Sequence, residues 1–138
     1  MINSILNYLE NMCYLMSTID VDLVNLIKNE LFYASKERNA IYIMGNGISS
    51  ATSEHFANDL AKKASEYLVN NLGFRVNAIT LTEPMPFLTA VANDMSLEEI
   101  FVESLKLNSK ENDILFVSSL SKPHTNIIKA FNMQEKKD

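Results

Sequence analysis

Residues 41–63, IYIMGNGISSATSEHFANDLAKK, place a strand, a glycine turn and a helix in one short stretch. The run 40–44 is apolar and rich in isoleucine and tyrosine, which is typical of a buried central strand. Two of the chain's three glycines follow it, and serines then precede a helical pattern over residues 50–70. In a parallel sheet, ligands collect beyond the carboxyl ends of the strands, so this junction is a candidate binding site.

The remainder of the chain continues the alternation of strands and helices. Such alternation predicts an α/β fold in which right-handed crossovers connect the strands of a parallel sheet. The pattern predicts further strands over residues 75–81 and 113–118, and helices over residues 84–92, 96–107 and 123–132.

Composition narrows the class of protein. A chain of 138 residues with 47% hydrophobic and 21% charged residues is typical of one small globular domain. The net charge of -5 argues against direct nucleic-acid binding, which needs a basic surface. The single cysteine, Cys13, excludes an internal disulfide, and its apolar position predicts a buried thiol. The N-terminus has neither the basic segment nor the long apolar run of a signal peptide or membrane span, so we expect a cytoplasmic protein.

Two amphipathic helices are expected ahead of the first strand. Asp20 or Asp22 can cap the second of them. The apolar seam of the first helix either contacts a neighbouring subunit or packs on its own domain, and the pattern supports both interpretations equally. The seam consists of Ile2, Ile5, Leu9, Met12, Met16 and Ile19.

Polar residues follow each of the three predicted strands. Glycines let the backbone approach a ligand, and the start of a helix offers free N–H groups, so the turn 45–50 either binds a phosphate or only caps its helix. It is neither a P-loop nor a dinucleotide fingerprint. The pair Asn93–Asp94 is a candidate for the site or a simple helix stop. The serine-rich segment 118–125 suits an anion or a solvated loop, and Pro123 can begin its helix.

His55, Asp59 and Lys63 are four residues apart and lie on one face of the predicted helix. A histidine and a carboxylate at this spacing can hold half of a metal site or form an acid–base pair. The same residues can instead form an exposed row of ion pairs, with Asp59 bound to Lys62 or Lys63. Spacing alone does not decide between these interpretations.

Three segments together resemble the sugar isomerase (SIS) domain family, and within it the branch of the phosphoheptose (sedoheptulose 7-phosphate) isomerases. The GNG-x-S turn, the HF-x-x-[DE]L segment and the Asn-Asp pair are the most specific features. The resemblance extends from the N-terminal helices to about Phe131. The three segments are GNGISSATSEHFANDL, AITLTEPMPFLTAVANDMSLEEIF and DILFVSSLSKPHTNIIKAF.

The resemblance implies a flavodoxin-like three-layer α/β sandwich, with residues 1–37 as an N-terminal helical oligomerisation segment and residues 38–138 as a partial SIS domain. The family assembles as a homotetramer and binds a phosphorylated sugar, such as sedoheptulose 7-phosphate. Its isomerases move a proton between C1 and C2 of the sugar through an enediol. Asp59 would then be the base, and His55 with Asp59 would supply two ligands to zinc where zinc is used. The substrate-binding residues implied by the resemblance are Asn46, Gly47, Ser49, Asn93, Asp94, Ser119, Ser121 and Lys122.

The chain departs from the family at several of these positions. Ile48 stands where the family has a glycine, Asp59 is one methylene shorter than the usual glutamate, and Lys63 replaces an arginine. The phosphate loop reads SLSKPH, which loses a hydroxyl and a Gly-Asn pair but gains Lys122. The family also continues for another strand and helix, which carry a second acid–base histidine, and we expect this C-terminal part to be missing here.

Two functions therefore compete. The first is isomerisation of sedoheptulose 7-phosphate in the synthesis of lipopolysaccharide or capsule heptose, with catalysis impaired by these departures. The second is a non-catalytic SIS module that binds a sugar phosphate or a protein partner, as one branch of the family binds the bacterial replication initiator. Acid–base isomerisation needs a donor and an acceptor on the substrate, so the departures favour the second function for this chain alone.

Overall fold

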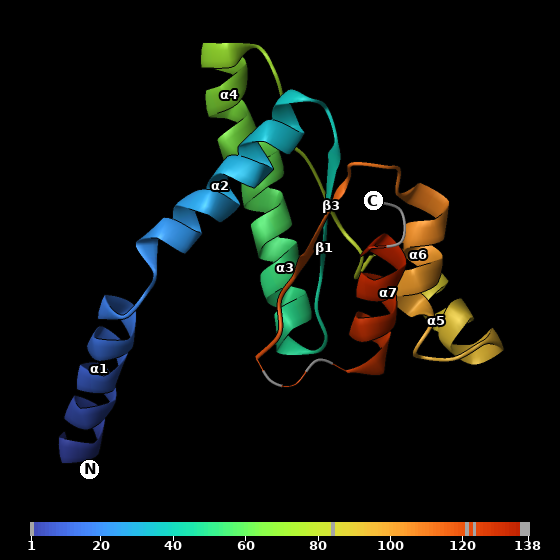
Figure 1. Cartoon of the computed structure of the whole chain (residues 1–138). Coiled ribbons are helices and arrows are strands. Elements are labelled where there is room, and N and C mark those ends of the chain that lie inside the picture. The colour runs from blue at the N-terminus through green and yellow to red at the C-terminus, as the bar shows by residue number, and fades with distance from the viewer. Residues whose placement is uncertain (1, 84, 121, 123, 136–138) are drawn as a thin grey trace. The chain divides into compact units, whose positions relative to one another are not determined.

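The computed structural model describes residues 2–83, 85–120, 122 and 124–135. The chain divides into two compact units, Met1–Glu30 and Leu31–Asp138. Figure 1 labels most of the elements along the chain. They are α1 (Ile2–Ser17), α2 (Val21–Lys36), β1 (Ala40–Met44), α3 (Ile48–Asp59), the π-helix η1 (Leu60–Ala64), α4 (Ser65–Leu72), β2 (Asn77–Thr80), α5 (Met85–Asp94), α6 (Ile100–Asn108), β3 (Ile114–Val117) and α7 (Thr125–Glu135).

The three strands form a parallel sheet in the order β2-β1-β3. In register, Tyr42 of β1 lies opposite Ile79 of β2 and Leu115 of β3. All five residues of β1 are buried, as the continuous apolar run predicts for a central strand. The prediction of a parallel α/β sheet is confirmed.

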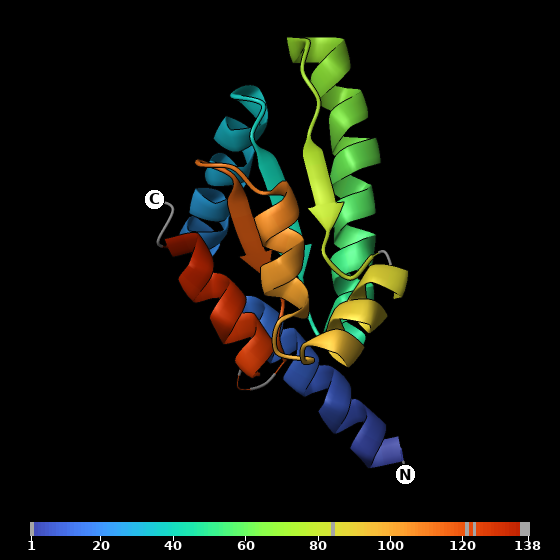
Figure 2. The same cartoon turned by 90° about the vertical axis from the view of Figure 1, so that its right-hand side faces the viewer.

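The two faces of the sheet are covered by different helices (Figure 2). Tyr42 and Met44 of β1 pack into a core with residues of α5, α6 and α7. Ile41 and Ile43 point to the opposite face, where the core includes Ala57 and other residues of α2, α3, η1 and α4. Because side chains alternate along a strand, one continuous apolar run supplies both cores. The result is the expected three-layer sandwich.

Several element boundaries differ from the predictions. The helix predicted over residues 50–70 is interrupted by η1, and the strand predicted over 75–81 is reduced to β2. The N–H of Val76 is bonded to the hydroxyl of Ser65 at 2.8 Å, so it does not join the sheet ladder. The helix predicted over 84–92 is observed as α5; residue 84 lies outside the described residues, as does Pro123, the proposed start of the last helix.

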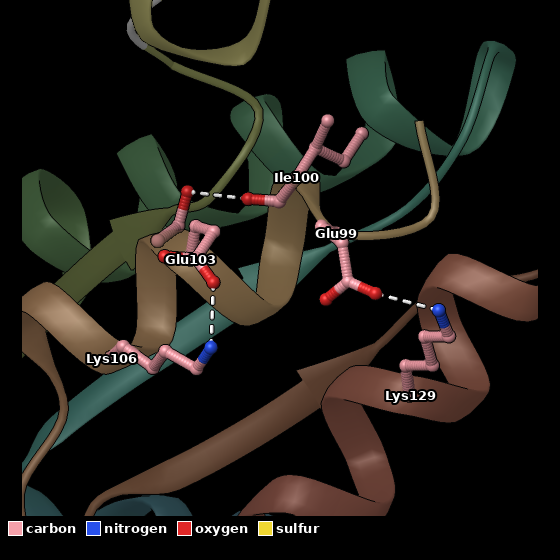
Figure 3. Close-up of polar contacts among 6 residues, drawn as sticks. Glu99, Ile100, Glu103, Lys106 and Lys129 are labelled. Carbon is pink, nitrogen blue, oxygen red and sulfur yellow. Dashed lines mark hydrogen bonds and ion pairs between the residues drawn. The ribbon is translucent and has the colours of Figure 1, made fainter. Parts of the chain in front are cut away.

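The start of α6 also lies later than predicted. The expected helix from residue 96 is replaced by a turn in which the Glu99 N–H donates to the Ser96 carbonyl at 3.1 Å. This turn directs two acidic side chains toward α7. Lys129 Nζ lies 2.6 Å from Glu99 Oε1 and 2.8 Å from Glu98 Oε2, and Figure 3 shows the Glu99–Lys129 contact. The ion pairs thus connect the turn before α6 with α7.

The N-terminal unit exposes its apolar side chains. Every residue from 3 to 30 is exposed, so the thiol of Cys13, predicted to be buried, is exposed in the single chain. The seam members Ile5, Leu9, Met12, Met16 and Ile19 are all among the exposed large hydrophobic residues. The side chain of Ile2 lies outside the described set. Of the two candidate caps of α2, Asp20 is the one observed, because its Oδ1 accepts the Leu23 N–H at 2.9 Å.

Within the described residues, the helices are too short or too polar to cross a lipid bilayer.

Candidate functional site

The starts of α3 and α7 lie at the same end of the sheet, beyond the carboxyl ends of β1 and β3 (Figure 1). The segment 45–47 connects β1 to α3, and the segment 118–124 connects β3 to α7. The N–H of Ser118 still donates to the carbonyl of Met44 at 2.9 Å, so the two segments begin side by side. Two of the three polar segments singled out in the sequence are therefore neighbours.

The glycine turn is packed tightly against the first turn of α3. A Cβ atom added to Gly45 would lie 2.7 Å from the backbone of Ser49. Gly47 has a positive φ of 56° at the N-cap position of α3. Residues other than glycine adopt this backbone conformation only at a cost in free energy. Hydrogen bonds of 3.0 Å from Ser49 N to the Asn46 carbonyl and from Ser50 N to the Gly47 carbonyl close the turn. Both glycines are thus required by geometry.

Asn46 is bound to a residue far along the chain. Its Nδ2 donates to Oδ1 of Asn126 at 3.0 Å, and Nδ2 of Asn126 donates back to Oδ1 of Asn46 at 3.0 Å. Asn126 is only 5% exposed, and it stands in the first turn of α7. Sequence reasoning did not identify Asn126, because a single asparagine after a serine-rich loop carries no signal of a partner 80 positions away.

A cavity of about 460 Å³ lies between the starts of these two helices. Of the predicted binding residues, Asn46 and Gly47 line it. Glu98 contributes a carboxylate, which the ion pair with Lys129 partly neutralises. The lining consists of Asn46, Gly47, Leu97, Glu98, His124, Thr125 and Asn126.

The other predicted binding residues are placed as follows. Ser49 is 5% exposed and packs behind the turn, next to Gly45. Asn93 and Asp94 form the exposed end of α5, where Asn93 Nδ2 donates to Asp94 Oδ1 at 2.9 Å. None of these three residues lines the cavity between α3 and α7.

The third loop is only partly described. Ser119 and Lys122 are exposed, and Ser121 lies outside the described residues. Ser118, which precedes them, lines a second cavity of about 710 Å³ on the α3 side of the sheet. The remaining lining of this cavity is mainly apolar and includes Ile43, Ile48, Phe56 and Phe116, together with His55 and Asp59.

His55, Asp59 and Lys63 form the row that their spacing predicts. Asp59 Oδ2 lies 3.2 Å from His55 Nε2, and Asp59 Oδ1 lies 3.1 Å from Lys63 Nζ. The His55 side chain is 81% exposed and that of Asp59 is 40% exposed. The hydrogen bond from Lys63 lowers the pKa of Asp59 most; partial burial opposes this, and the positive charge of Lys63 and the contact with His55 lower the pKa further. The arrangement favours the interpretation as an ion pair.

Replacing Lys63 by glutamine should raise the pKa of Asp59 toward its ordinary value, because the principal donor to the carboxylate is lost. A carbon-13 NMR titration of the carboxyl group measures this directly. The matched control is Lys62→Gln, which removes one positive charge from the neighbouring position and leaves the Asp59–Lys63 pair intact. Because the folded pKa is lowered, any stability from the pair is present above the unfolded pKa and is lost as the pH falls through the folded value. An equal shift in both variants would contradict the assignment.

The donor set for zinc is incomplete among the described residues. Zinc in proteins takes at least three protein ligands, usually from histidine, cysteine and carboxylates. His55 and Asp59 provide two, and in the part of the chain that the structure describes no third His, Cys, Asp or Glu joins them. The present residues do not fit a zinc site by themselves, and no chemical step is assigned to a metal.

Comparisons with known proteins link the sequence to one group of enzymes. Phosphoheptose isomerase 2 of Campylobacter jejuni is 30% identical over 122 residues, which cover 86% of this chain and 58% of the relative. A phosphoheptose isomerase of Helicobacter pylori is 33% identical over 96 residues, which cover 70% of this chain and 47% of the relative. The phosphoheptose isomerase of Aneurinibacillus thermoaerophilus is 30% identical over 115 residues, which cover 83% of this chain and 56% of the relative. The chain spans about half the length of the curated relatives it matches. No family model matches the sequence.

Solved structures share the fold. The phosphoheptose isomerase GmhA of Neisseria gonorrhoeae matches with a TM-score of 0.82 and 21% identity, covering 99% of this chain and 69% of its own. A phosphoheptose isomerase of Francisella tularensis matches with a TM-score of 0.83, at the same identity and coverage. At this level of identity the likeness concerns the fold, and it confirms the expected α/β architecture.

Proposed function

Because the chain belongs to the sugar isomerase (SIS) family together with the phosphoheptose isomerases, we propose that it binds a phosphorylated sugar in the cavity between α3 and α7. The observation that carries this proposal is the convergence of two helix starts on one cavity. Sedoheptulose 7-phosphate is the ligand that we infer from the names of the relatives. These relatives are longer than this chain, so any isomerase activity of this chain is likewise our proposal.

The chemistry of the cavity suits an anion. The helix dipole is positive at the start of a helix and attracts an anion there, even though the N–H groups of Ser49, Ser50 and Ile127 already have acceptors. Gly47 and Thr125 mark these ends of α3 and α7, and both line the cavity. Without a side chain at Gly47, a phosphate can approach the backbone closely. Glu98 opposes anion binding, but its contact with Lys129 offsets part of that charge. We assign the phosphate group to this cavity and the sugar to its rim.

We propose that isomerisation by this chain is weak. An aldose–ketose isomerase removes a proton from C1 of the ketose and delivers one to C2. A general base works best when its pKa lies near the working pH, whereas the contact with Lys63 lowers the pKa of Asp59. Asp59 also lines the mainly apolar second cavity, which shares no residue with the cavity between α3 and α7. The lowered pKa of Asp59 and its separation from the proposed phosphate site both support binding of the sugar phosphate without efficient isomerisation.

The alternative function is that of a non-catalytic module that binds a protein partner. The exposed apolar residues of the N-terminal unit indicate that this unit contacts another protein chain. The exposed apolar residues of α1 are too numerous and too regularly spaced to be the scattered hydrophobic residues of an ordinary surface. We infer that copies of this chain cover them, as a homo-oligomer for which a tetramer is the favoured state. We propose the cytoplasm as its location.

Isothermal titration calorimetry of the purified chain tests the binding. We expect sedoheptulose 7-phosphate to bind more tightly than inorganic phosphate, and unphosphorylated sedoheptulose to bind more weakly than either. In an isomerase assay we expect no turnover above background. Absence of heat and of thermal stabilisation at millimolar sugar phosphate would refute the binding proposal. Robust turnover that is lost on Asp59→Asn would refute the proposal of weak catalysis.

A further inference from the structure

The amide pair between Asn46 and Asn126 joins the two segments that form the cavity. Its two hydrogen bonds, both 3.0 Å long, use one donor and one acceptor of each side chain. The Oδ1 atom of Asn126 also accepts the N–H of Ile127 at 2.9 Å, which fixes the side chain in the first turn of α7. Asn126 is buried, whereas Asn46 is partly exposed to the cavity.

We propose that Asn126 is a positioning residue that holds Asn46, and through it the glycine turn, against the start of α7. This inference rests on the proposed function, because the turn and the helix start are the two sides of the proposed anion site. The backbone hydrogen bonds that close the turn run from Ser49 and Ser50 to the carbonyls of Asn46 and Gly47, within the segment 46–50. The amide pair adds a connection to α7, which sets the distance between the two helix starts.

The physical benefit is preorganisation. A loop that is already held in its binding conformation loses less conformational freedom when the ligand binds. Removal of the Asn126 amide also leaves a donor and an acceptor of Asn46 without these partners, and Asn46 is only partly exposed to solvent. A protein without Asn126 should therefore fold but bind the anion more weakly.

Calorimetry on three proteins tests the effect on binding. We expect Asn126→Ala to weaken the binding of both sedoheptulose 7-phosphate and inorganic phosphate by about tenfold. Asn132→Ala is the matched control, because Asn132 is an exposed asparagine on the same helix. Circular dichroism at the working temperature verifies that each variant is folded. Wild-type affinity in folded Asn126→Ala would overturn the proposal.

Asn126→Asp separates positioning from a general effect on the fold. A protonated carboxyl group keeps the one donor and the one acceptor that the pair with Asn46 uses, so it can rebuild that pair. An ionised carboxylate offers acceptors only and places a negative charge beside the anion. The ratio of wild-type to variant affinity should thus be near one at low pH and should rise as the carboxyl group ionises. Because the ligand's phosphate ionises in the same way with both proteins, its effect on affinity cancels in this ratio. A ratio of affinities that does not change with pH would contradict the proposal.

Nitrogen-15 NMR without ligand distinguishes a failure of this inference from a failure of the proposed function. In Asn126→Ala we expect shifts of the Asn46 side-chain amide and of the Gly47 backbone amide, and in Asn132→Ala we expect neither. If these shifts occur but the wild type binds neither ligand, the proposed function is wrong and the positioning role stands. If both resonances stay unchanged in Asn126→Ala, the positioning role is wrong whatever the protein binds.

Discussion

Leu9→Asp combined with Met16→Asp should convert the protein from an oligomer to a monomer. Both side chains belong to the exposed apolar seam of α1, which we propose is buried between copies of the chain. A carboxylate placed in an apolar interface without a partner costs several kcal/mol, and each 1.4 kcal/mol weakens association about tenfold. Two such charges in each chain should weaken the assembly by on the order of a thousandfold or more. Light scattering coupled to size-exclusion chromatography at micromolar concentration measures the result.

A pair of substitutions on the opposite side of α1 provides the control for added charge. Asn7→Asp and Asn11→Asp introduce the same two negative charges away from the seam, since helical spacing places residues 7 and 11 on the other face. This variant should keep the wild-type mass. The interface would have to lie elsewhere if the wild type were a stable, folded monomer, or if both double variants dissociated alike.

Gly45→Ala should cause the largest loss of stability among single substitutions near the site. The added Cβ would lie 2.7 Å from the backbone carbon and oxygen and the Cβ of Ser49, so α3 itself would have to move. Overpacking in a well-packed interior costs about 1–3 kcal/mol, and more where backbone must shift. We expect a loss of about 3 kcal/mol in the free energy of unfolding, together with loss of phosphate binding. Urea denaturation and calorimetry measure the two effects.

Gly73→Ala separates this steric effect from the ordinary cost of replacing a glycine. Gly73 ends α4 with a φ of 78°, and a Cβ added there would meet no atom within 4 Å. The substitution should cost about 1 kcal/mol through backbone strain alone and should leave ligand binding unchanged. Equal losses in the two variants would show that the contact with Ser49 relaxes without cost.

The sequence predicted the central part of the fold well, because burial and periodicity are local signals there. Residues 40–44 form a continuous apolar run between polar Asn39 and Gly45, and β1 has these bounds. The shortening of the second strand depends on the bond between Ser65 and Val76, which joins residues on different elements. The late start of α6 depends on the contacts of Glu98 and Glu99 with Lys129, about thirty positions later. Neither effect is visible in a local pattern.

In the candidate site, too, local patterns could be predicted from the sequence and contacts between distant residues could not. The row formed by His55, Asp59 and Lys63 follows from spacing along one helix, and the structure confirms both contacts. The pairing of Asn46 with Asn126 depends on how the sheet brings two loops together, so residue type and spacing contain no trace of it. The roles of Asn93, Asp94, Ser119, Ser121 and Lys122 in binding stay predictions.

The position of β1 between the two other strands determines how the domain can unfold. Its even-numbered residues belong to one core and its odd-numbered residues to the other, so displacement of this single strand exposes both at once. Partial opening that keeps one half of the domain native is therefore disfavoured, and the two cores should be lost in one cooperative transition. The backbone amides of β1 should consequently exchange with solvent only through unfolding of the whole domain.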